Sequence, residues 1–63
     1  MAPHQERVVN ERNELSEKLD KLVAFFDSSI FQSLDFAERG RLHLQRHAME
    51  IYLGILTQRI AAF

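Results

Sequence analysis

Residues 39–52 are predicted to form the first half of a long second helix; they read Arg39-Gly40-Arg41-Leu42-His43-Leu44-Gln45-Arg46-His47-Ala48-Met49-Glu50-Ile51-Tyr52. Apolar residues recur at 42, 49 and 53 on one side of a helix and at 44, 48, 51 and 55 on another, so two faces of this helix need cover. Its first turns carry three arginines and two histidines, where the free N–H groups and the helix dipole are already positive. That excess of positive charge disfavours the bare helix and favours a bound anion.

The residues before this stretch predict a first helix and a turn. The segment 5–26 contains neither Gly nor Pro, and Pro3 can occupy the first turn of a helix because its missing N–H costs nothing there. Asp27, Ser28 and Ser29 are typical of a helix end, since their short side chains bond to nearby backbone. The first helix is therefore expected to span about 4–27.

A short connector and a second helix follow. The apolar run 30–34 is predicted to form a helical turn within a connector that covers 28–34. Asp35-Phe36-Ala37-Glu38 has the form of a capping box, with Asp35 as the N-cap and Glu38 reaching back to it. The second helix is expected to run over about 35–62.

Each predicted helix carries an apolar stripe whose spacing alternates between four and three residues, as in the seam of a coiled coil. Arginine interrupts each stripe once, at 12 and at 46. The stripes match after a shift of 34 residues: Val8, Arg12, Leu15, Leu19, Leu22 and Phe26 in the first, and Leu42, Arg46, Met49, Leu53, Leu56 and Ile60 in the second. Since the connector is short, the sequence predicts an all-α fold, an antiparallel two-helix hairpin that forms one αα-hairpin domain over 1–63.

The hairpin leaves a second face of the second helix uncovered. This face is apolar and too large for a small monomer to expose; its members are Leu44, Ala48, Ile51, Ile55 and Ala62, with Tyr52 beside them. The chain has 63 residues, no cysteine and three histidines, so neither disulfides nor structural zinc can reinforce a small core. We therefore expect a homo-oligomer assembled through the second helix.

The composition limits the class of partner. The formal net charge of -1 argues against a generally basic surface for polymeric nucleic acid or for a membrane, so any nucleotide ligand should be small. Residues 1–7 lack the apolar segment of a signal peptide, and no apolar run approaches the ~20 residues of a membrane span. We expect a soluble cytoplasmic protein.

Arginines are the main candidates for ligand binding. Arg39, Arg41 and Arg46, together with Gln45, can hold phosphate oxygens, because guanidinium groups form bidentate charge-assisted bonds. The alternative is a solvated basic face that pairs with the acidic first helix of a neighbouring chain. An arginine inside an apolar seam, as at Arg12 and Arg46, either extends its head outward or meets a carboxylate or a ligand across an interface.

The other polar and aromatic residues admit two interpretations each. Met49 and Tyr52 can pack against a purine base, although a Met and a Tyr on a helix are also typical of a core or an interface. His43 and His47 lie one turn apart, but no third metal ligand with suitable spacing accompanies them. We predict no metal and no cofactor, and we place these histidines near an anion site or an interface.

The sequence also offers little for catalysis. It has no cysteine nucleophile, no glycine-rich loop, and no paired carboxylates in an apolar setting that would separate their pKa values. We therefore expect a binding protein and not an enzyme.

Residues from both helices resemble a known family. They run His4-Gln5-x-Arg7-Val8-Val9-x-Glu11, then Glu14-Leu15-x-x-Lys18-Leu19-x-x-Leu22 and Phe25, then Arg41-x-x-x-Gln45-x-x-x-Met49-x-x-Tyr52-x-x-Ile55-Leu56-x-x-Arg59-Ile60-Ala61. This pattern, which covers nearly the whole chain, is similar to short helical-hairpin proteins of bacteriophages related to the anti-CBASS and anti-Thoeris sponges. The resemblance implies interlocked oligomers, typically homohexamers, in the host cell cytoplasm. Such oligomers serve immune evasion by sequestering cyclic nucleotide signals at subunit interfaces without hydrolysis.

The resemblance also implies site residues. The family's trinucleotide-binding arginine stands one turn before a Gln-x-x-x-Met and is similar to Arg41, with Gln45 and Met49 matching the rest of that motif. The family's dinucleotide pocket uses a basic residue and a tyrosine near the start of the first long helix. Arg7 or Arg12 matches the basic residue, whereas the first helix here has no tyrosine. The implied ligands are cyclic trinucleotides, cyclic dinucleotides or both.

Two other functional classes remain open. One is a protein–protein interaction module without a nucleotide ligand, in which the face formed by Leu44, Ala48, Ile51 and Ile55 binds a host or phage protein. The other is a small DNA-associated regulator whose arginines contact phosphates. The net charge argues against the second class, as does the lack of a short basic recognition helix after a tight turn.

Overall fold

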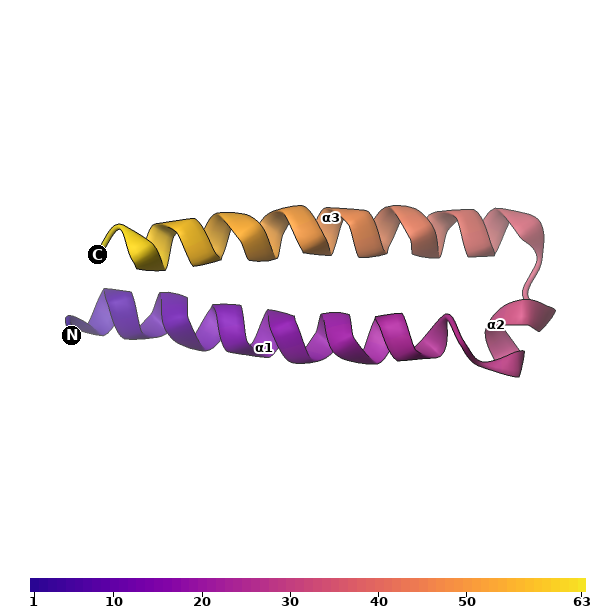
Figure 1. Cartoon of the computed structure of the whole chain (residues 1–63), viewed down its shortest axis with the longest axis horizontal. Helices are drawn as coiled ribbons and strands as arrows, with labels where there is room; N and C mark the ends of the chain where they lie inside the picture. The colour runs from indigo at the N-terminus through magenta and orange to yellow at the C-terminus, as the bar shows by residue number, and fades with distance from the viewer.

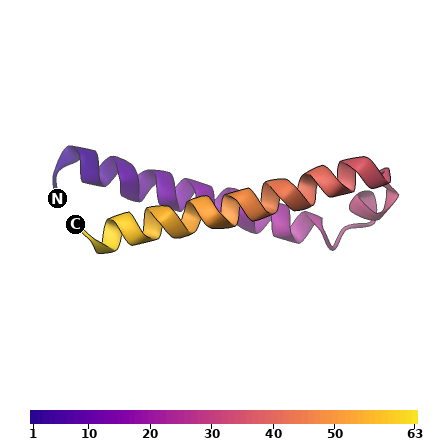
Figure 2. The same cartoon turned by 90° about the horizontal axis from the view of Figure 1, so that it is seen from above.

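The protein is an all-helical hairpin in a computed structural model that describes residues 1–63. The chain forms α1 (Pro3–Phe25), α2 (Ser29–Ser33) and α3 (Phe36–Ala61), with no strand. The two long helices run antiparallel along a molecule of 46 × 15 × 13 Å, with both termini at one end and α2 at the other (Figure 1). Seen from above, they cross at a shallow angle (Figure 2). None of the helices combines the length and apolar character that a membrane crossing requires.

Ser28 separates α1 from α2. Its hydroxyl donates to the carbonyl of Phe25 at 2.6 Å and accepts from the N–H of Phe31 at 3.1 Å. The same side chain therefore bonds the last residue of α1 and caps α2, which explains why α1 ends two residues before the expected position. At the other end of α1, Pro3 is in the first turn, as predicted.

The start of α3 differs from the prediction in its side-chain bonding. Asp35 is the N-cap residue, but its side chain makes no capping hydrogen bond. Glu38 does not reach back either; its Oε1 accepts from Nε of Arg41 at 2.8 Å. The expected capping box was wrong because a charged guanidinium one turn ahead offers Glu38 a stronger, charge-assisted donor than the backbone does.

The core lies between the two long helices, as the matching stripes predict. Every member of both stripes is buried or half-buried. Only four residues of the chain are buried, namely Val8, Leu19, Phe31 and Leu56, and of these only Leu56 is fully buried. The single chain therefore has a thin core, since two helices can cover only one face of each other.

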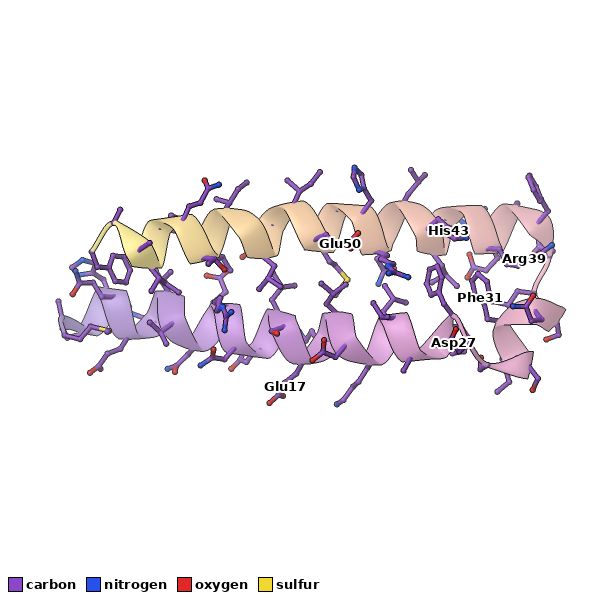
Figure 3. The ribbon with its side chains drawn as sticks, in the orientation of Figure 1. Glu17, Asp27, Phe31, Arg39, His43 and Glu50 are labelled. Carbon is purple, nitrogen blue, oxygen red and sulfur yellow. The ribbon has the colours of Figure 1, made fainter.

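Aromatic rings close the end of the hairpin at α2. Phe31 is buried and stacks on Phe26 with ring centroids 4.5 Å apart, while Phe25 meets it edge-on at 6.1 Å. The His43 ring from α3 lies edge-on to Phe26 at 4.8 Å. Phe31 and His43 face this end from opposite sides of the hairpin (Figure 3). The five-residue α2 thus acts as an apolar lid over the seam.

The outer face of α3 is uncovered. Leu44, Ile51 and Ile55 are 71%, 53% and 49% exposed, and Tyr52 is 42% exposed. These residues belong to the second apolar stripe that the sequence places on this helix. Large apolar side chains in one exposed stripe are typical of a surface that another chain covers.

Candidate functional site

Four of the predicted ligand-binding residues form a row along one side of α3. Arg41, Gln45 and Met49 stand on successive turns, and Tyr52 follows on the same side. Gln45 Nε2 lies 3.9 Å from Met49 Sδ, so these two side chains extend along the helix toward each other. We call these four residues the α3 row. It combines an exposed guanidinium, amide and aromatic ring at Arg41, Gln45 and Tyr52 with the thioether of Met49, which is half-buried at the edge of the seam.

Arg41 is the charged end of the α3 row. Its side chain is 66% exposed, and its Nε–H donates to Glu38 Oε1 at 2.8 Å. The two Nη groups make no hydrogen bond within the chain, so they are free to bind phosphate oxygens. The pairing of Glu38 with Arg41 was not predicted, although the i,i+3 spacing of opposite charges was a signal for it.

Arg46 lies inside the hairpin and apart from the α3 row. Its guanidinium carbon is 5.2 Å from the centroid of the Phe26 ring, and its Nε is 3.9 Å from Glu50 Oε2. A cation over an aromatic face is stabilised by the ring quadrupole. Contacts within one chain therefore account for the arginine in the α3 seam.

Arg39 lies at the closed end of the hairpin, in the second turn of α3 (Figure 3). It is half-buried, and its Nε is buried without a hydrogen-bond partner. The arginines that the sequence analysis grouped together thus have different environments: Arg39 is at the closed end, Arg46 is in the seam, and Arg41 is on the surface.

The two candidate arginines of α1 lie far from the α3 row. Arg7 is exposed, and Arg12 is half-buried with its Nη1 donating to Asn13 Oδ1 at 3.3 Å. Arg12 also lines a hollow of about 340 Å³ between the open ends of the long helices, with Val9, Asn13, Thr57, Ile60 and Ala61. Arg41 and Thr57 are 16 positions apart, which is ~24 Å along a helix, so one chain cannot bring Arg12 and Arg41 to one small ligand.

The histidines do not form a recognisable metal centre. Both histidines are exposed; the His43 ring lies edge-on to Phe26 and Phe31 at the closed end, and His47 stands one turn later. No group of three His, Cys, Asp or Glu side chains is arranged to hold an ion. The contact of His43 with Phe26 and Phe31 gives this residue a packing role.

The comparisons with known proteins give one result. The family model described as Sequestin matches residues 2–62, which include the α3 row and both arginines of α1. Neither a curated protein nor a solved structure matches the chain.

Proposed function

Because the chain belongs to the Sequestin family, we propose that it sequesters a cyclic oligonucleotide signal, either a cyclic trinucleotide or a cyclic dinucleotide, without hydrolysing it. The family name denotes sequestration. The class of ligand comes from the residues of the α3 row and from the resemblance to the phage sponges. Capture of the signal in the host cell cytoplasm would leave an anti-phage effector inactive, which is an anti-CBASS activity.

The α3 row is the observation that carries this proposal. A cyclic oligonucleotide presents phosphates and flat bases, and the row offers a matching group for each. Arg41 has free Nη groups for phosphate, while Met49 and Tyr52 supply apolar and aromatic surface for a base. Gln45 stands between them and can donate to a base edge or a phosphate oxygen.

Assembly of several copies is the second part of the proposal. One exposed arginine on a helix surface is a weak anion site, and Glu38 already neutralises part of its charge. A homo-oligomer, a hexamer by the resemblance, would cover the outer face of α3 and gather Arg41 from several subunits. Repulsion between those arginines is relieved when the anionic ligand binds, so the ligand should stabilise the assembly.

Isothermal titration calorimetry tests the proposal with a panel of cyclic di- and trinucleotides. We expect heat of binding for at least one member, and a loss of that heat in Arg41→Ala. Lys18→Ala is the matched control, because it removes one exposed positive charge from α1 and should bind as the wild type does. Absence of heat for every nucleotide, or equal heat from Arg41→Ala, would contradict the proposal.

Recovery of the ligand distinguishes capture from turnover. After incubation and heat denaturation of the protein, chromatography should return the bound cyclic nucleotide intact and in stoichiometric amount. Conversion of excess ligand to a linear product would show catalysis instead.

The exposed outer face of α3 favours one alternative. A helical hairpin whose Leu44, Ile51 and Ile55 are exposed can bind a different protein as an interaction module without a nucleotide ligand. In that case no cyclic nucleotide of the calorimetric panel would give heat of binding, and a defined partner protein would bind to this face.

A further inference from the structure

The outer face of α3 carries a complete second coiled-coil seam. Its spacing alternates between four and three residues along the helix, and every member is exposed to solvent in the single chain. We call it the outer stripe; it consists of Ala37, Arg41, Leu44, Ala48, Ile51, Ile55, Gln58 and Ala62. Arg41, the charged end of the α3 row, is therefore also a seam position of this stripe.

The outer stripe is self-complementary when it is read from its two ends. Counting outward from the midpoint between 49 and 50, Ala48 meets Ile51 and Leu44 meets Ile55. Further from the midpoint, Arg41 lies opposite Gln58 and Ala37 lies opposite Ala62. Each small or polar residue thus faces a residue that it can pack against or bond to. We propose that the α3 helices of two copies pack antiparallel along this stripe, with a two-fold axis at that midpoint.

Charge favours the antiparallel orientation over the parallel one. A parallel pair in register would place Arg41 beside Arg41 of the second copy, inside the seam, and like charges there repel. The antiparallel pair places Arg41 opposite the neutral Gln58 within the seam, and the nearby Arg59 of the second copy lies on the flank beside Glu38. The orientation is therefore selected by a residue that the ligand proposal also needs.

The flanks of the outer stripe supply a second, independent match. Residues Glu38, Gln45, Tyr52 and Arg59 line one flank, and all four are half-buried or exposed. In an antiparallel pair the same flanks of both copies adjoin, so Glu38 of one copy lies beside Arg59 of the other at both ends of the interface. Gln45 lies beside Tyr52 in the same way. Opposite charges therefore meet twice in this pairing.

The opposite flank consists of small residues except for His47. Gly40 and Gly54 stand there, and a Cβ added at either position would meet nothing within 4 Å. Neither residue has a positive φ, so the hairpin itself does not require glycine at these positions. Glycine inside a helix costs about 1 kcal/mol relative to alanine, and close approach of another chain is a reason to keep it. This flank has room for further copies beside the pair.

The pairing adds Arg59 to the proposed ligand site, an assignment that rests on the proposed function. Arg41 and Arg59 lie on the same side of α3 but about five turns apart, or ~27 Å, so one chain cannot use both on one ligand. The antiparallel pair brings Arg41 of one copy beside Arg59 of the other. Glu38 then offsets only one of two guanidinium groups, which leaves a net positive charge for a phosphate at each end.

Cross-linking tests the orientation directly, because the chain contains no cysteine. Leu44→Cys and Ile55→Cys are prepared separately, mixed in equal amounts and oxidised. The antiparallel pair predicts that the disulfide between the two variants dominates, since these positions face each other within disulfide reach. Dominance of links within one variant, or absence of any link, would overturn the pairing. Glu17→Cys, on the side of α1 that faces away from α3 in Figure 3, is the control and should stay unlinked.

A charge exchange tests the flank. Arg59→Glu and Glu38→Arg each place like charges together in a pair of identical copies, whereas a mixed pair restores both attractions. Sedimentation should show weaker assembly for each variant alone and recovery for the mixture. Wild-type assembly of each variant alone, without preference for the mixture, would overturn the proposed register.

Calorimetry with Arg59→Ala separates this inference from the proposed function. We expect binding of the responsive cyclic nucleotide to weaken about tenfold or more. Unchanged affinity together with the predicted cross-link would refute the role of Arg59 and leave the pairing in place. The predicted cross-link between Leu44→Cys and Ile55→Cys, together with a wild type that binds no nucleotide, would refute the proposed function and leave the pairing in place.

Discussion

At the scale of single residues, position decides what each arginine can do. Arg46 lies over Phe26 with Glu50 nearby, whereas Arg41 keeps two free Nη groups on the surface. Both are arginines of the same helix, five positions apart. Only the second is available to a ligand that approaches from solvent.

The substitution Arg46→Met tests whether Arg46 serves packing within the hairpin and not ligand binding. The thioether side chain can fill the seam position at similar length, and its apolar burial offsets the loss of a cation–π contact worth about 0.5–1 kcal/mol at an exposed site. We expect the free energy of unfolding to change by less than about 1 kcal/mol and nucleotide affinity to stay at the wild-type level. Thermal denaturation and calorimetry measure the two quantities, and lost affinity with an intact fold would place Arg46 in the site.

Residue types and spacing predicted part of the environment of these side chains. The grouping of Arg41, Gln45 and Met49 came from the family resemblance, and their spacing of four residues places neighbouring members on successive turns of one helix. The sequence did not reveal that Glu38 would bind Arg41. The backbone N–H of Asp35 and the guanidinium of Arg41 both lie three positions from Glu38, and both can donate to its carboxylate. Nor did spacing alone show that Arg39 turns inward while Arg41 turns outward.

At the scale of elements, the position of α2 depends on the hydroxyl of Ser28 and the ring of Phe31. Ser28 bonds to the backbone of both α1 and α2, and Phe31 is the buried residue of the lid. The connector was predictable as a helical turn from its apolar run. The residue at which the connector begins was not predictable, because Asp27, Ser28 and Ser29 could each have ended α1. Only the hydrogen bonds of the folded chain identify Ser28 as the residue between α1 and α2.

Replacement of Ser28 should loosen the closed end. Ser28→Ala removes the N-cap of α2, and loss of such a cap costs about 0.5–2 kcal/mol. Circular dichroism during heating should show a lower midpoint than for Ser29→Ala, an exposed neighbouring serine that makes no such bond. Equal midpoints for the two variants would show that the capping bond contributes nothing measurable.

Replacement of Phe31 should have a larger effect. Phe31→Ala empties the centre of the aromatic cluster, and truncation of a buried phenylalanine costs about 3–5 kcal/mol. Because the core of one chain is thin, we expect this variant to lose most of its cooperative thermal transition. Phe31→Leu retains much of the volume and should recover a transition; a wild-type transition in Phe31→Ala would contradict the role of the lid.

At the scale of the whole molecule, the hairpin presents one covered and one uncovered face of α3. The pattern of residues predicted both faces, because two stripes on one helix demand two partners. The first partner, α1, follows from the chain itself. We propose that the second is another copy, and a single sequence does not specify how many copies gather or in what order.

A charge on the outer stripe should disperse the assembly without unfolding the hairpin. Ile51→Asp places a carboxylate at the centre of the proposed interface, where its desolvation is unfavourable. Sedimentation should shift toward the 7.4 kDa monomer while helix content persists. Ile30→Asp is the control, since Ile30 is 62% exposed on α2, away from that stripe, and should assemble as the wild type does. Equal sedimentation of both variants would exclude the outer stripe as the interface.

Ligand binding should stabilise the assembled molecule. At a free ligand concentration 100 times the dissociation constant, binding contributes about 2.7 kcal/mol, which corresponds to roughly 10–20 °C in the melting midpoint of a domain this small. Raised salt should reduce the increase, because it screens the attraction between guanidinium and phosphate. A midpoint that does not respond to any cyclic nucleotide would contradict capture.

The thin interior of the single hairpin has a consequence for the protein in a cell. With four buried side chains, a solitary copy has little to resist fraying, and proteases cleave frayed helices readily. If copies pair along the outer stripe as we propose, the paired chains would resist proteolysis and the unpaired chains would be degraded. The lifetime of the protein would then increase with its concentration. Below the concentration at which copies pair, chains would be short-lived; above it, the protein would accumulate.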